Sequence, residues 1–167
     1  TAQAAGAGDE IEVRAVLGRA LLLAIGLGTL LILLQWPVRV IAFLLLDGTD
    51  SVEILASDYF QIRIWGAPAT LTNFALMGLL IGLGLGKSVL LVQLFLNGLN
   101  ILLDVWFAAI LKLGVAGIAL GTVIAEWMTV ALAGYLIFRK LQQNKIPNES
   151  FWPKARVLDK PMLMKTL

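Results

Sequence analysis

Four polar side chains follow one another along the otherwise apolar residues 88–111. Gln93, Asn97, Asn100 and Asp104 are separated by steps of four, three and four residues. On an α-helix these spacings place the four side chains on one face, within roughly 40° of a common line. An ionised carboxylate in a bilayer core costs at least ~2.5–3.5 kcal/mol, so such a group normally faces a cavity or a partner. The stripe favours an intramembrane site for a cation or proton; the alternative is an amide ladder that holds helices together, with Asp104 neutral or paired.

A hydroxyl in the next apolar segment is expected at the same depth as this stripe. If the chain turns at Lys112, Asp104 lies about 12 Å from the turn, Thr122 about 15 Å and Asn100 about 18 Å, at 1.5 Å per residue. A carboxylate, a hydroxyl and an amide carbonyl are hard oxygen ligands. We therefore predict that Asn100, Asp104 and Thr122 form a site for Na⁺ or a proton.

The segment that carries Thr122 has two further features. Thr122, Glu126 and Thr129 follow an i, i+4, i+7 pattern and are expected on one face. Glu126 is either a second titrating group or a structural hydrogen-bonding partner, and the sequence leaves both open. Gly117 and Gly121 form a GxxxG step, which predicts close approach of a neighbouring helix.

The elements that must position these residues are predicted to be transmembrane helices. Of the 167 residues, 59% are apolar and 14% are charged, and the mean hydropathy is +0.89. A helix needs about 20 apolar residues to cross a bilayer. Four windows meet this requirement, which predicts an all-α membrane protein with spans at about 13–36, 60–86, 88–111 and 114–140.

The segments between and beyond the spans are expected to be short or polar. Asp9, with Glu12 three residues on, is a candidate helix N-cap. Residues 1–12 are predicted to form a turn, residues 82–88 a second turn and residues 141–167 a polar linker. Pro37 should break the first helix, with a short helix following at 38–46. An amphipathic segment at 51–63 should lead into the second span, which should kink at Pro68. The linker is rich in Lys and Arg, and the loop at 47–53 is acidic, so both ends of the segment are expected in the cytoplasm.

The residue types present argue against an enzyme. There is no histidine and no cysteine, so the commonest general base and the thiolate nucleophile are both missing. The sequence GLGLGKS at 82–88 fails the phosphate-loop pattern, because Ile81 stands where glycine is required. We expect no cofactor, and no nucleic-acid partner, since the basic tail already satisfies the positive-inside rule.

Four stretches of the chain resemble the multidrug and toxic compound extrusion family, within the subfamily named after DNA-damage-inducible protein F. They are TAQAAGAGD, IRIWGAPATLTNFALMGLLIG, NILLDVW and GVAGIALGTVIAEW, and the resemblance covers residues 1 to about 141. It implies a twelve-helix transporter with two lobes, of which this chain would supply the third to sixth helices of the first lobe and the cytoplasmic linker between the lobes. The first two helices and the second lobe would be its partners within the same protein.

The resemblance also implies a function. The family exports organic cations and other amphiphiles, coupled to inward flow of protons or sodium ions, and the family's asparagine, aspartate and threonine ligands match Asn100, Asp104 and Thr122. The family's first-helix aspartate has no counterpart here. We assign to the lining of a substrate cavity Gln93, Asn97, Asn73, Met77 and Glu126. The predicted function is a cation-coupled antiporter in the bacterial inner membrane; the alternatives are a flippase-like exporter of lipid-linked substrates and a structural membrane subunit.

Overall fold

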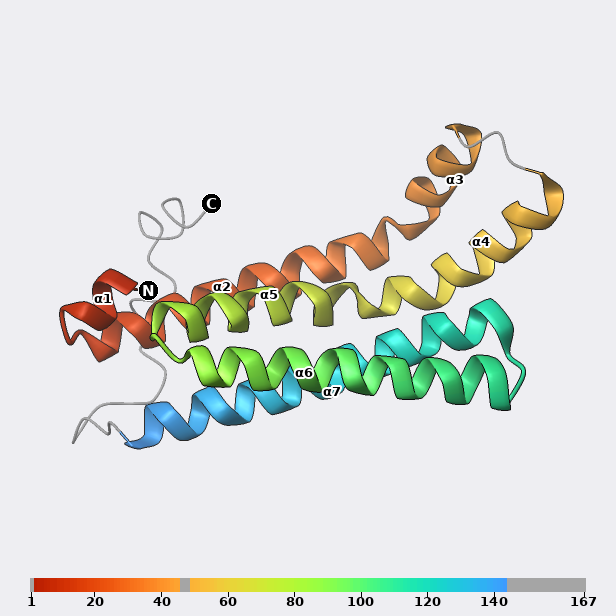
Figure 1. Cartoon of the computed structure of the whole chain (residues 1–167). Coiled ribbons are helices and arrows are strands. Elements are labelled where there is room, and N and C mark those ends of the chain that lie inside the picture. The colour runs from red at the N-terminus through yellow and green to blue at the C-terminus, as the bar shows by residue number, and fades with distance from the viewer. Residues whose placement is uncertain (1, 46–48, 144–167) are drawn as a thin grey trace.

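The structure is a computed structural model, and it describes residues 2–45 and 49–143. Most of the linker predicted at 141–167 therefore lies outside the described residues, as does part of the acidic loop. Within the described ranges every regular secondary-structure element is a helix, and short turns join them (Figure 1). The elements are α1 (Ala2–Gly6), α2 (Glu10–Leu33), α3 (Gln35–Leu45), α4 (Asp50–Arg63), a 3₁₀ turn η1 (Ile64–Gly66), α5 (Ala67–Gly82), α6 (Gly86–Asp104), a π-helical segment η2 (Val105–Ile110) and α7 (Gly114–Gln143).

Four helical stretches are long and apolar enough to cross a membrane, as the sequence predicts. They are Glu10–Leu33, Asp50–Gly82, Gly86–Ile110 and Gly114–Gln143. The second stretch combines α4, η1 and α5, so the amphipathic segment does lead directly into the second span. The turn between α5 and α6 is shorter than predicted, because Gly84 adopts a φ of 69° and α6 already begins at Gly86.

In each of the first two spans the regular α-helix is interrupted a few residues before a proline. α2 ends at Leu33, three residues earlier than expected, because the ring of Pro37 would clash with the carbonyl of residue 33. The chain then continues as α3, which diverges from α4 (Figure 1). Pro68 likewise follows the 3₁₀ turn η1 and occupies the first turn of α5, where its missing N–H is tolerated.

The N-terminal segment differs in part from its prediction. Residues 1–12 were expected to form a turn, but Ala2–Gly6 is helical and α2 begins at Glu10. The alanines of AQAAG have the highest helix propensity of any residue type, which explains the extra helix. The N-cap is confirmed, because the Glu12 backbone N–H donates to Asp9 Oδ1 at 2.9 Å.

The buried apolar core lies at one end of the bundle, where α2 and α6 begin and α5 and α7 end. Its residues are Val13, Leu17, Leu76, Leu79, Leu80, Val92, Ala133, Ile137 and Leu141. No residue of α3 or α4 is buried. The four helices are therefore packed tightly at the end near the N-terminus, while α3 and α4 extend from the other end (Figure 1).

Two buried arginines reinforce the packed end. Arg14 donates from Nη2 to the Leu141 carbonyl at 3.0 Å and lies 3.8 Å from a Glu10 carboxylate oxygen. Arg19, 2% exposed, forms an ion pair with Glu12. A buried guanidinium needs such partners, because an unpaired charge in a low-dielectric interior is very costly. The hydrogen bond from Arg14 to Leu141 joins the start of α2 to the end of α7, and the two ion pairs lie within α2.

Candidate cation site between two spans

The predicted trio comes together at the interface between α6 and α7. The Asn100 amide nitrogen donates to Thr122 Oγ1 at 3.0 Å and lies 3.4 Å from Asp104 Oδ1. Thr122 donates its own hydroxyl to the Ile118 carbonyl at 2.9 Å, which fixes the orientation of its oxygen. All three side chains are half-buried. The depth argument made from the sequence therefore agrees with the observed pairing of Asn100 with Thr122.

Asp104 reaches α7 because two glycines let the backbones approach closely. A Cβ atom at Gly121 would lie 2.5 Å from Asp104 Oδ1 and 3.1 Å from the Asp104 backbone nitrogen. A Cβ atom at Gly117 would lie 2.8 Å from the Phe107 carbonyl carbon. Any side chain at either position would separate the helices, so the packing role predicted for the GxxxG step is confirmed.

The helical geometry changes immediately after Asp104. Val105–Ile110 forms a π-helical segment, in which the Leu111 N–H donates to the Trp106 carbonyl five residues earlier at 3.0 Å. The sequence predicted one continuous α-helix over 88–111. Short π-helical segments occur often at functional sites, because the extra residue redirects side chains. Here the wider turn begins at the residue that follows the carboxylate.

Asp104 differs from the other membrane-embedded carboxylate in having no basic partner among the described residues. The salt bridges within those residues involve Arg14, Arg19 and Arg63 only. The same residues contain no group of three or more His, Cys, Asp or Glu side chains that could hold a metal ion. The trio offers one carboxylate, one amide and one hydroxyl, but the Asn100 amide directs its nitrogen toward Asp104 and Thr122. The carboxylate and the hydroxyl are hard oxygen ligands, and the Asn100 oxygen would join them as a ligand for Na⁺ after rotation of the amide.

Glu126 forms a separate cluster with α4 and α5. Arg63 donates from Nη2 to Glu126 Oε1 at 2.6 Å and from Nη1 to Oε2 at 2.9 Å. Thr70 Oγ1 lies 2.9 Å from Oε2, and the Asn73 side-chain nitrogen donates to the Glu126 carbonyl at 3.0 Å. Glu126 is only 7% exposed, and a Cβ atom at Gly66 would lie 2.7 Å from its Oε2 atom. This geometry is that of a bidentate structural ion pair.

The other residues assigned to a substrate cavity are not gathered around the trio. Gln93 and Asn97 are exposed, and the Asn97 amide donates to the Gln93 carbonyl at 2.9 Å. Asn73 is buried beside Glu126, and Met77 packs against the apolar core. The polar stripe thus divides: its second half contacts α7, and its first half remains on an exposed face of α6.

Sequence reasoning missed the partners of Glu126. Arg63 and Thr70 lie 63 and 56 residues away in the chain. The available signal was that Arg63 is a charged residue at the start of an uncharged segment, 64–86, which makes a buried counter-ion on another helix plausible.

The architecture and the site define a class of protein. Four apolar helices, a carboxylate at a helix interface without a basic partner and a discontinuous span are features of multi-spanning membrane transporters, in which ionisable groups mark ion pathways.

Comparison with known proteins identifies the family. The MatE family profile matches residues 1–106, and the chain belongs to that family, the multidrug and toxic compound extrusion family. It is 40% identical to DNA damage-inducible protein F of Escherichia coli over 141 residues, which is 84% of this chain and 30% of that protein. It is 36% identical to Protein DETOXIFICATION 43 of Arabidopsis thaliana over 93 residues, 55% of this chain and 17% of that protein. No solved structure matches the chain. The chain therefore spans less than a third of the length of these two relatives.

Proposed function

We propose that this chain provides the cation-binding part of an antiporter that exports organic cations and amphiphilic compounds by alternating access. Inward movement of protons or sodium ions would drive the export. The observation that carries the proposal is the contact of Asn100 with both Asp104 and Thr122, across the interface of two membrane-spanning helices. Membership of the MatE family supports the same function.

In this mechanism the charge on Asp104 is the quantity that changes during the cycle. An ionised carboxylate inside a span is unfavourable by at least ~2.5–3.5 kcal/mol on insertion scales. Binding of a proton or Na⁺ neutralises that charge, and Asn100 and Thr122 would supply the remaining oxygen ligands. The neutral site favours a different packing of α6 against its neighbours from the charged one. Export is coupled if the drug and the ion bind preferentially to different conformations.

The exposed half of the polar stripe is the proposed contact surface for the exported compound. Gln93 and Asn97 continue from the cation site along the same helix, and both are exposed. Their amides donate and accept hydrogen bonds and carry no charge, so they would orient a cationic amphiphile without trapping it. Asn73 and Met77 remain part of the proposed cavity lining only if the helices repack during transport.

The proposed setting is the inner membrane of a bacterium, with both ends of this segment in the cytoplasm. The tail is rich in lysine and arginine, and the loop that joins the first two spans is acidic. Segments rich in lysine and arginine usually lie on the cytoplasmic side of the membrane, which supports this orientation. In the proposed whole transporter, two further helices of the first lobe and a second six-helix lobe complete the transport pathway.

Asp104→Asn in the native full-length protein tests the proposal. We expect ion-driven efflux from proteoliposomes to be lost, because an asparagine cannot exchange a proton or carry the charge that binds Na⁺. Proton and sodium gradients are imposed separately, which also identifies the coupling ion. Asp58→Asn is the matched control, since Asp58 is an exposed carboxylate on α4, whereas the trio belongs to α6 and α7. Undiminished ion-driven efflux by Asp104→Asn would refute the proposal, and loss of folded protein in that variant would support the structural-subunit alternative.

A further inference from the structure

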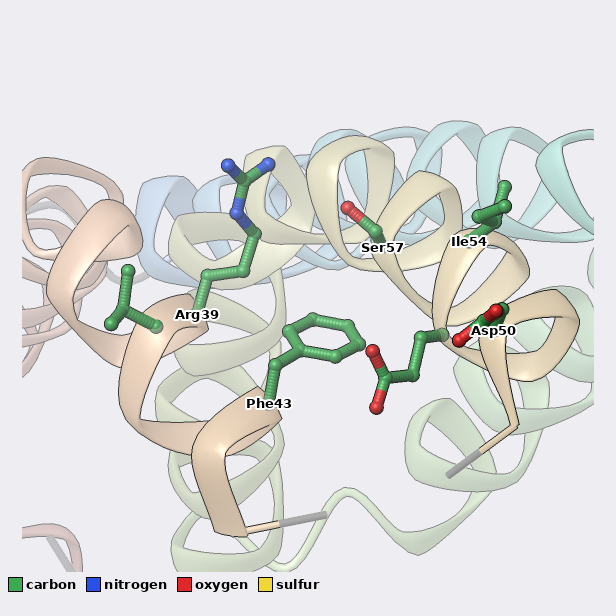
Figure 2. Close-up of a pocket in the computed structure, with 7 residues that line it drawn as sticks. Arg39, Phe43, Asp50, Ile54 and Ser57 are labelled. Atoms are coloured by element: carbon green, nitrogen blue, oxygen red, sulfur yellow. The ribbon is translucent and has the colours of Figure 1, made fainter. Parts of the chain in front are cut away.

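A pocket lined by both apolar and charged side chains lies between α3 and α4, away from the cation site. It has a volume of about 470 Å³ and is lined by Arg39, Val40, Phe43, Asp50, Glu53, Ile54 and Ser57. Figure 2 shows Arg39 and Phe43 projecting from α3, and Asp50 and Ser57 from α4, on the two sides of this pocket. The volume is within the range of pockets that hold small molecules.

The two walls of the pocket carry opposite charges. Arg39 supplies a guanidinium from α3, and Asp50 and Glu53 supply carboxylates from α4. The salt bridges among the described residues do not include Arg39, Asp50 or Glu53, so within those residues the charges face one pocket without pairing. A ligand with a negative and a positive group a few ångströms apart could form an ion pair with each wall. A purely anionic ligand would pair with Arg39 but would be repelled by the two carboxylates.

The length of the second span places this pocket at the level of the lipid headgroups. Asp50–Gly82 contains 33 residues and is about 50 Å long at 1.5 Å per residue. A hydrocarbon core of about 30 Å accommodates about 20 of these residues. With the span centred on the bilayer, about 10 Å, or six to seven residues, extends beyond the core at each end, and the headgroup layer on each side is about 5–7 Å thick. Residues 50–56 therefore lie in the headgroup layer or just outside it, and they include Asp50, Glu53 and Ile54 of the pocket.

The α3 wall has the composition of a membrane–water interface. Trp36, which is 68% exposed, precedes Arg39, and both line a second, adjoining pocket of about 250 Å³ with Gln35, Phe60 and Gln61. Tryptophan is enriched at the headgroup level of membrane proteins. Apolar side chains such as Phe43 and Ile54 lie beside the charged groups, so acyl chains and a polar headgroup could be accommodated together.

We propose that the pocket between α3 and α4 binds the headgroup of a zwitterionic phospholipid, with the phosphate at Arg39 and the ammonium group at Asp50 and Glu53. Guanidinium–phosphate and ammonium–carboxylate contacts are both charge-assisted hydrogen bonds. The bound lipid would fill the space between two helices that bury no residue against the bundle. This site is independent of the transport mechanism proposed above.

The test measures lipid retention by the native full-length protein, purified and analysed by native mass spectrometry. Phosphatidylethanolamine and phosphatidylglycerol with identical acyl chains are supplied in equal amounts. We expect the zwitterionic lipid to be retained about fivefold more than the anionic one, the scale of one or two partly exposed ion pairs. Soluble glycerophosphoethanolamine at the same concentration is expected not to displace the lipid, and displacement would overturn the assignment to a membrane lipid.

Variants on the two walls of the pocket are expected to change lipid retention in different ways. Arg39→Gln should reduce retention of both lipids, because each loses its phosphate partner. Asp50→Asn with Glu53→Gln should leave a net positive pocket and shift the preference toward phosphatidylglycerol. Asp58→Asn, on the same helix but outside the pocket, should retain the parent preference. Equal retention of the two lipids by the parent protein, undiminished lipid retention by Arg39→Gln, or an unchanged preference in the Asp50→Asn, Glu53→Gln variant would overturn the proposal.

Discussion

The close approach of α6 and α7 at Gly121 gives a quantitative prediction. Gly121→Ala adds a Cβ atom 2.5 Å from Asp104 Oδ1, 3.1 Å from the Asp104 nitrogen and 3.2 Å from the Leu103 carbonyl carbon. The carboxylate can rotate away, but the two backbone atoms cannot, so the helices must separate. Overpacking of this kind costs about 1–3 kcal/mol.

A matched control isolates the effect of the contact. Gly134 lies on the same helix, and a Cβ atom there would meet no atom within 4 Å. Alanine is favoured over glycine inside a helix by about 1 kcal/mol at both positions. Gly134→Ala should therefore be neutral or stabilising, and Gly121→Ala should be less stable than Gly134→Ala by about 1–3 kcal/mol.

The assay is thermal or denaturant unfolding of the purified full-length protein, together with binding of the coupling ion by calorimetry. Gly121→Ala should also weaken ion binding, because separation of α6 from α7 lengthens the contact between Asn100 and Thr122. Equal stability and equal ion binding in the two alanine variants would refute the inferred backbone contact.

Three further predictions concern other contacts of the bundle. Glu126→Gln should lower the stability by about 2 kcal/mol, less than the ~3–5 kcal/mol for a fully buried pair because Arg63 is 27% exposed, and a nonpolar replacement of both residues should restore the loss in unfolding assays. Gly28→Ala should destabilise the protein by about 1–3 kcal/mol, because its Cβ atom would lie within 3 Å of three atoms of the α5 proline, whereas Gly26→Ala, with open space around it, should not. Thr122→Val should abolish ion-coupled transport in proteoliposomes and Thr122→Ser should retain it, since only serine keeps the hydroxyl; equal transport by the two variants would show that the hydroxyl is not a ligand.

Hydropathy was sufficient to predict the spans, and helical spacing was sufficient to predict the trio. Both depend on local regularities: uncharged windows of about 20 residues, and side chains that repeat every three or four residues. The pairing of Asn100 with Thr122 could be predicted because a tight turn fixes the depth of both residues relative to Lys112. The roles assigned to these residues remain predictions.

Contacts between distant segments could not be predicted in the same way. The i, i+4 relation placed Thr122 and Glu126 on one face, yet Thr122 contacts α6 while Glu126 contacts α4 and α5. A separation of about 40° around the helix is enough to direct two side chains to different neighbours. The π-helical segment after Asp104 also escaped prediction, because no residue in VWFAAI is a helix breaker.

The position of the apolar core determines which parts of the molecule can move easily. Since neither α3 nor α4 contributes a buried residue, these two helices can change their separation without breaking any contact of the core. Arg63 ties the end of α4 to Glu126 of α7, so amide hydrogen exchange should be slowest around Leu80 and Ile137 and fastest in α3. Because α3 and α4 can move in this way, the molecule that occupies the space between them determines how far apart they lie. The packing of the apolar core at the opposite end of the bundle does not change.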